Sequence, residues 1–181
     1  MELVVDRFLR FRAGATFDLA TGVPVLVREA AIAEDAEQAA WATRMSALMS
    51  LRHPHLASVV DFGAVGPSRR FEAIALSGRE RPWPRRDADA IAAIASVVDF
   101  LHARGLSAGR IGWARVVDGG GRPVLVPDAG CGAEMGHPGG APVERERDAL
   151  AELLAACARG ARLAAERPDG GRIGAWGGFA L

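Results

Sequence analysis

The sequence contains no lysine, no asparagine and no tyrosine, so arginine supplies all 22 of its basic side chains. Without lysine the chain can form no Schiff base and can grip no phosphate with an ammonium group. Without asparagine no metal site can use that side-chain amide. The accompanying wealth of alanine, arginine and glycine is typical of GC-rich genomes, but the chemistry is excluded whatever its origin.

Cysteine is scarce as well. Cys131 and Cys157 occur in no CxxC or Cys/His spacing, which fits a reducing compartment and predicts no structural zinc. No uncharged run reaches the ~18 apolar residues of a membrane-spanning helix. The first residues, Met1-Glu2-Leu3, lack the basic start of a secretion signal. We therefore expect a cytoplasmic protein without a membrane partner.

The charges balance, with 22 basic and 22 acidic residues and a formal net charge of zero. This balance argues against a nucleic-acid partner held by bulk charge and against a polybasic membrane module. Half of the 181 residues are hydrophobic, which predicts a globular chain of about one domain.

Hydrophobic periodicity predicts a mixed α+β chain. The expected order is short strands within residues 1–30, a helix over 34–53, strands over 56–62 and 71–76, an Arg/Pro-rich linker over 78–86, a helix over 87–105, a hairpin over 114–126, a loop over 128–142 and a helix over 142–160. This order predicts two small lobes, residues 1–80 and 81–160, followed by a glycine-rich tail over 161–181.

Four stretches resemble the protein kinase family, especially bacterial serine/threonine kinases. Residues 18–28 (DLATGVPVLVR) resemble the hairpin that ends at the ATP-binding lysine, and residues 51–63 (LRHPHLASVVDFG) resemble the passage out of the small-lobe helix. Residues 100–105 (FLHARG) resemble the helix end before the catalytic loop, and residues 128–130 (DAG) stand where the metal-binding DFG would. The resemblance covers roughly residues 7–160 and implies a bilobal kinase-like fold, with a small antiparallel sheet lobe and a reduced helical lobe. The DFG spelled by residues 61–63 comes too early and is expected to be ordinary strand.

The residues at the catalytic positions do not match the family. The resemblance places Arg28 at the ATP-binding lysine, Arg44 at its glutamate partner, Arg110 at the catalytic aspartate and Arg115 at the magnesium-binding asparagine. Arginine cannot accept a proton at ordinary pH. The surviving Asp128 alone is a poor magnesium site. We therefore expect a pseudokinase that uses no cofactor and no metal.

Three arrangements of these arginines are possible. In the first, Arg28 bridges to Asp128 and fills the cleft. In the second, most of the arginines extend into solvent. In the third, the cluster holds an anion or nucleotide without metal. Because two arginines close together repel, Arg28 and Arg44 are expected to point apart or share an anion.

The third predicted helix resembles the kinase helix that anchors the catalytic loop through an aspartate. Either Glu146 or Asp148 occupies the anchoring position, and the spacing to Leu150 favours Glu146. Only about a dozen residues separate Gly130 from this helix, which predicts a short activation segment. No clear helical period follows it, so the peptide-binding helices of a complete kinase are not expected.

Two regions are candidates for an interface with another protein. Residues 81–86 (RPWPRR) combine Arg81, Trp83 and Arg85, a composition found at interface hot spots, although Trp83 could instead pack between the lobes. Trp176 and Phe179 in the tail could dock on the second lobe or lead to a partner.

These features predict a catalytically inactive kinase-like domain that acts as a scaffold or regulatory module. Its partner would be another protein or a further subunit of the same assembly. The alternative is a divergent nucleotide-binding phosphotransferase or regulator that uses Asp128 and the arginine cluster. A third possibility is a small α+β domain unrelated to kinases.

Overall fold

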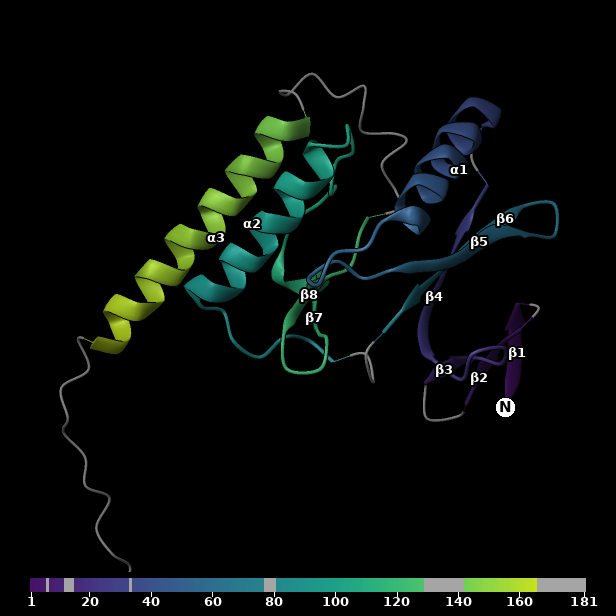
Figure 1. Ribbon diagram of the computed structural model, residues 1–181, viewed down its shortest axis with the longest axis horizontal. Helices are drawn as coiled ribbons and strands as arrows, with labels where there is room; N and C mark the ends of the chain where they lie inside the picture. The colour runs from purple at the N-terminus through teal and green to yellow at the C-terminus, as the bar shows by residue number, and fades with distance from the viewer. Residues whose placement is uncertain (6, 12–14, 33, 77–80, 129–141, 166–181) are drawn as a thin grey trace, which may run out of the picture.

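The chain folds as a twisted antiparallel sheet with one helix, followed by two helices and a small hairpin (Figure 1). The computed structural model describes residues 1–5, 7–11, 15–32, 34–76, 81–128 and 142–165. In chain order the elements are β1 (Glu2–Val5), β2 (Phe8–Arg10), β3 (Thr16–Asp18), β4 (Pro24–Ala31), α1 (Asp35–Ser50), β5 (Val59–Val65), β6 (Arg69–Ala75), α2 (Ala88–His102), a 3-10 turn (Trp113–Arg115), β7 (Val116–Asp118), β8 (Pro123–Leu125) and α3 (Pro142–Ala165).

The N-terminal lobe is built on a six-stranded sheet in the order β1-β2-β3-β4-β6-β5, with every pair antiparallel. Alternation along β4 buries Val25 and Val27 on one face and directs Leu26 and Arg28 to the other. Helix α1 buries Trp41 with the rest of its apolar face and lies beside β5.

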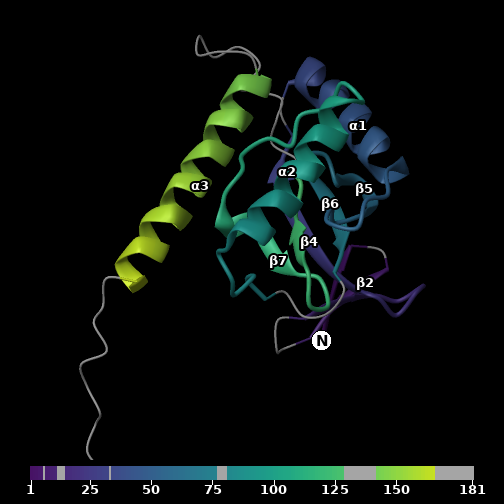
Figure 2. The same ribbon diagram turned by 60° about the vertical axis from the view of Figure 1, so that its left-hand side comes forward.

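The C-terminal lobe begins at α2, where the Asp87 side chain accepts a hydrogen bond of 2.9 Å from the Ala90 amide and caps the helix. Both views show α3 lying alongside α2, on the side of the lobe away from the sheet (Figures 1 and 2). The β7–β8 hairpin lies between α2 and the sheet.

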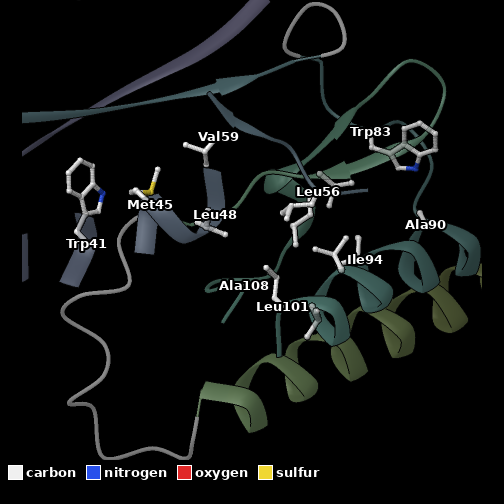
Figure 3. Close-up of a cluster of buried hydrophobic side chains, with 14 residues drawn as sticks. Trp41, Met45, Leu48, Leu56, Val59, Trp83, Ala90, Ile94, Leu101 and Ala108 are labelled. Atoms are coloured by element: carbon white, nitrogen blue, oxygen red, sulfur yellow. The ribbon is translucent and has the colours of Figure 1, made fainter. Parts of the chain in front are cut away.

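A single apolar cluster joins the two lobes (Figure 3). It contains one face of α1, one face of α2, the linker tryptophan Trp83 and residues of the hairpin. Because α1 and α2 share this core, separating the lobes would expose apolar surface to water. Each Å² exposed costs about 25 cal/mol of free energy. The relative position of the lobes is therefore part of the folded core.

The predicted α+β architecture is confirmed, with two local corrections. Leu56, expected to begin a strand, forms only an isolated bridge to Leu125, and the strand begins at Val59. Helix α3, expected to end at Gly160, continues to Ala165, so the boundary of the predicted tail at residue 161 falls inside a helix. Glycine in a helix costs only about 1 kcal/mol relative to alanine, and the helix tolerates it here among many alanines.

No helix among the described residues has both the length and the apolar character needed to cross a bilayer.

Candidate functional site

Three arginines from three different elements converge on the backbone of Pro127 and Asp128. They are Arg28 from β4, Arg44 from α1 and Arg115 from the 3-10 turn. We call these three residues the arginine clamp. Their positions are those that the kinase resemblance assigns to the ATP-binding lysine, its glutamate partner and the magnesium-binding asparagine.

Arg28 pairs with a carboxylate that lies directly opposite it in the sheet. The register of β4 and β6 places Glu72 across from Arg28, and Arg28 Nη1 lies 3.4 Å from Glu72 Oε1. The same nitrogen donates to the Pro127 carbonyl at 3.3 Å. Of the three possible arrangements, the bridge from Arg28 to Asp128 is therefore not the one that the structure shows. Glu72 lies directly across from Arg28 on the neighbouring strand, and side chains in such cross-strand positions interact directly.

Glu72 is only 5% exposed, and this burial is the main cause that raises its pKa above the ordinary glutamate value. The positive charge of Arg28 and its hydrogen bond to Glu72 act in the opposite direction, while the charge of Asp128 adds to the increase. The ion pair therefore only partly offsets the cost of burying the charged carboxylate.

This raised pKa predicts a pH dependence of stability. At low pH Glu72 is protonated in both the folded and the unfolded chain and costs nothing. As the pH rises from below 4.5 toward neutrality, ionisation of the buried carboxylate lowers the free energy of unfolding. We therefore expect the wild-type free energy of unfolding to fall relative to that of Glu72→Gln over this range, as measured by urea unfolding at each pH.

The matched control is Glu29→Gln, because Glu29 is the residue next to Arg28 in β4. Because Glu29 forms its own ion pair with Arg69 (3.0 Å), this variant shows how far the loss of a paired glutamate in β4 alone changes the profile. Parallel profiles for wild type and Glu72→Gln would contradict the assignment.

The carboxylate of Asp128 is engaged by Arg115. Arg115 Nη2 lies 2.9 Å from Asp128 Oδ1, and Arg115 Nη1 donates to the Pro127 carbonyl at 3.3 Å. The Asp128 side chain is 14% exposed and that of Arg115 25% exposed. At this distance the opposite charges attract, and the partial burial of both side chains reduces screening by water. The one acidic position retained from the kinase metal site is thus paired with a guanidinium.

Arg44 ties α1 to the C-terminal lobe. Its Nη2 donates to the Ser107 carbonyl at 2.6 Å and to the Asp128 carbonyl at 3.2 Å, and its Nε reaches the Asp128 carbonyl at 3.3 Å. Arg28 and Arg44 therefore use separate acceptors, as the expected repulsion between them requires. Arg44 thereby fixes two segments of the C-terminal lobe, at Ser107 and at Asp128, to a helix of the N-terminal lobe.

A cavity of about 210 Å³ lies beside the arginine clamp. It is lined by residues of both lobes, Arg28, Glu29, Ala30, Trp41, Arg70, Phe71, Glu72, Arg115 and Asp128. Arg110 is exposed and does not belong to this lining, as in the arrangement that extends arginines into solvent. Among the described residues no group of three or more His, Cys, Asp or Glu side chains is placed to hold a metal ion.

Next to the cleft, the lobes meet through apolar side chains. Leu26 of β4, together with Ile74 of β6 and the following Leu76, packs against residues of the β7–β8 hairpin and Val126. Ile74 and Val126 are almost completely buried. The space between the lobes is therefore filled by the chain itself at this point.

Glu146 of α3 anchors the loop that carries Arg110, as the sequence favoured. It is 3% exposed, its Oε1 accepts hydrogen bonds from Ser107 Oγ and from the Gly109 amide (2.9 Å to the amide), and its Oε2 lies 2.7 Å from His102 Nε2. A carboxylate oxygen accepts hydrogen bonds, so His102 Nε2 is the donor in this pair. Gly109 has φ 80°, a conformation that favours glycine and that aims its amide at Glu146.

The linker tryptophan is not a surface anchor. Trp83 is 7% exposed and packs in the core between the lobes, so its role as an interface candidate is corrected in favour of packing. Arg81 and Arg85 are exposed, and the Arg85 guanidinium lies 5.2 Å from the centre of the Trp83 ring. Trp176 and Phe179 lie outside the described residues.

The early DFG at residues 61–63 lies in ordinary strand, as expected. Asp61, Phe62 and Gly63 lie within β5, where Phe62 packs edge-on against Trp41 with ring centres 5.5 Å apart. Nearby, the ring of His53 packs against that of Phe100 with centres 4.9 Å apart, and burial is the main cause that lowers the pKa of His53.

Comparison with known proteins links this arrangement to kinases. The chain is similar to the Mycobacterium tuberculosis PknI kinase domain (C20A mutant), with TM-score 0.61 and 17% identity over 81% of this chain and 69% of that chain. The protein has a kinase-like fold. It is also similar to a chain of the yeast RNA Pol II CTD kinase CTDK-1 complex, with TM-score 0.50 and 11% identity.

That second match covers 72% of this chain and 47% of the yeast chain, so the kinase-like protein spans about half the length of that relative. No protein-family model matches the sequence, and no curated protein matches it either. At these identities the likeness defines the fold, and the chemistry must be argued from the residues of the kinase-like cleft itself.

Sequence reasoning missed Glu72, which the kinase-like fold brings directly to Arg28. A signal was present, because Glu72 is the one charged residue in the otherwise apolar stretch 71–76. A charge in a buried strand calls for a partner. Naming that partner required the strand register.

Proposed function

We propose that this chain is a kinase-like domain that does not transfer phosphate and that acts as a protein-binding scaffold or regulatory module. The support for the proposal is that the fold is retained while the residues for phosphate transfer are not. The fold retains the two lobes, the closed position of α1 and the anchored loop, while the residues that would move a phosphoryl group have been replaced by arginine.

One observation carries the proposal, the 2.9 Å ion pair between Arg115 and Asp128. In a kinase, an asparagine and an aspartate at these positions hold the magnesium ions that neutralise the phosphates. Here the cationic Arg115 stands at the asparagine position, and Asp128 is paired with it. A metal ion would have to displace the guanidinium, and it would then find a single carboxylate.

The residue at the catalytic base position points the same way. An arginine, Arg110, stands there, and a guanidinium is not a proton acceptor for an attacking hydroxyl. Arg28 is committed to Glu72 and Pro127 rather than open to the phosphates of a nucleotide. Shape and surface are what remain available for function, which favours binding of another protein or of a further subunit of the same assembly.

The test is transfer of the γ-phosphate from labelled ATP with Mg²⁺ or Mn²⁺, to the protein itself and to generic protein substrates. We expect no label above that of the Asp128→Ala variant. Incorporation by the wild type that disappears in Asp128→Ala would refute the proposal, because it would assign working chemistry to the one retained acidic position.

A second candidate is a regulator that binds an anion or a nucleotide without metal. It is favoured by the cavity of about 210 Å³, whose lining includes Arg28, Arg70 and Arg115. Three carboxylates share that lining, however, and they neutralise much of the positive charge. We therefore place this candidate second.

A further inference from the structure

Exposed large hydrophobic side chains are concentrated at one end of the sheet. Of the seven among the described residues, five lie within residues 1–23. They are Met1, Leu3, Phe11, Leu19 and Val23, whereas Met49 and Leu154 lie elsewhere. Single exposed apolar residues are normal on a protein surface, but a cluster on one small sheet is typical of an interaction site.

The strand register continues this cluster as a row of apolar side chains, in which Leu3 and Phe11 are exposed and the others are half-buried. Leu3 lies opposite Leu9, Leu9 opposite Phe17, and Phe17 opposite Pro24. Phe11 joins the row by packing edge-on against Phe17 with ring centres 5.6 Å apart. We call these five residues the apolar row.

The apolar row lies on the face of the sheet that meets the C-terminal lobe. Alternation along β4 places Pro24 on the same face as Leu26 and Arg28, which contact that lobe. The β1–β3 end of the sheet lies far from α2 and α3 (Figures 1 and 2). Leu3 is 57% exposed and Phe11 40%, so this continuation of a packed face is left uncovered.

The row ends at an open strand edge. β1 is the outermost strand of the sheet, and no other strand of the described residues pairs with its outer edge. Such an edge offers unpaired N–H and C=O groups to an added strand. β1 has the sequence ELVV, with no proline to block pairing and only Glu2 as a charge.

We propose that β1 pairs antiparallel with β1 of a second copy of this chain, joining the two sheets across a two-fold axis. A strand added at this edge satisfies the open backbone groups and extends the apolar row at the same time. A second copy fits because its own row ends at the same edge, so that Leu3 lies beside Leu3 of the other copy and the two rows become continuous.

Charge also favours a second copy. With the pairing centred on Leu3, Glu2 of each copy lies across from Val4 of the other, so no like charges face each other along the strands. The formal net charge of the chain is zero, so no long-range repulsion opposes association. The proposal is independent of the chemistry of the cleft, and its failure would leave the proposed function untouched.

The test is the oligomeric state, measured by sedimentation equilibrium over a wide range of protein concentration. We expect a reversible dimer whose dissociation constant rises about tenfold or more in Leu3→Arg and in Leu3→Glu, because each places like charges side by side across the axis. An equimolar mixture of the two variants should recover the dimer, since arginine then lies beside glutamate.

Leu154→Arg is the matched control, because Leu154 is 49% exposed on α3, away from the sheet. It should dimerise like the wild type, and circular dichroism should show that all variants are folded. A monomer at every concentration would overturn the proposal and leave the apolar row to another occupant. A dimer broken by Leu154→Arg but not by the Leu3 variants, or a mixture that fails to recover, would overturn it as well.

Discussion

Replacing Glu146 with alanine is expected to lower the free energy of unfolding by about 3–5 kcal/mol. The side chain is 3% exposed and accepts from Ser107 Oγ, from the Gly109 amide and from His102 Nε2. Removing it leaves three partly buried donors without their acceptor, and each lost partner costs on the order of 1–3 kcal/mol. The measurement is equilibrium unfolding in urea, with hydrogen exchange at Gly109 as a local readout.

Two variants separate this role from a general effect on the helix. Glu152→Ala removes an exposed glutamate from the same helix and should change stability by less than about 0.5 kcal/mol. Glu146→Gln keeps the shape and one acceptor oxygen, so its loss should be smaller than that of alanine. If Glu146→Ala were no more destabilising than Glu152→Ala, the anchoring role would be wrong.

Arg44→Met is expected to be the next most costly of the changes considered. Methionine retains much of the aliphatic stem but none of the three hydrogen bonds to the Ser107 and Asp128 carbonyls. Hydrogen bonds from a charged donor contribute about 1.5–3 kcal/mol in total for such a group. For a chain of this size that loss lowers the melting temperature by roughly 3–12 °C.

The control is Arg52→Met, because Arg52 is exposed and donates only to the nearby Met49 and Leu51 carbonyls. Its effect should be small. Hydrogen exchange should also show faster opening of α1 in Arg44→Met and not in Arg52→Met. Equal melting temperatures for the two variants would show that Arg44 does not hold the lobes together.

Much of the fold could be predicted because its signals are local. Asp87 before an apolar period and Gly105 after it mark the two ends of α2, and the glycines at 119–121 mark the β7–β8 turn. The role of Glu146 was also accessible, because one fixed spacing along a helix decides which carboxylate faces the loop.

The partners within the site could not be predicted, because they depend on register and packing. A bridge from Arg28 to Asp128 was one of the arrangements that the sequence allowed, yet the pairing of β4 with β6 supplies Glu72 to Arg28, and Arg115 binds Asp128. The stretch around Trp83 has the composition of an interface. Only the packing of both lobes against Trp83 shows that it belongs to the core.

Arg110, which the resemblance places at the catalytic aspartate, is exposed, whereas Arg28, Arg44 and Arg115 of the arginine clamp bind within the cleft. All three meet at Pro127 and Asp128, the segment that would carry the metal in a working kinase.

Thermal unfolding with and without Mg²⁺ and ATP tests the claim of a self-filled cleft most directly. Binding at a hundredfold excess over the dissociation constant would stabilise the protein by about 2.7 kcal/mol and raise its melting temperature by roughly 5–10 °C. We expect no shift, because Arg115 holds Asp128 and Arg28 is bound to Glu72 and to the Pro127 carbonyl. A saturable rise that requires Mg²⁺ and is lost in Asp128→Ala would contradict this account.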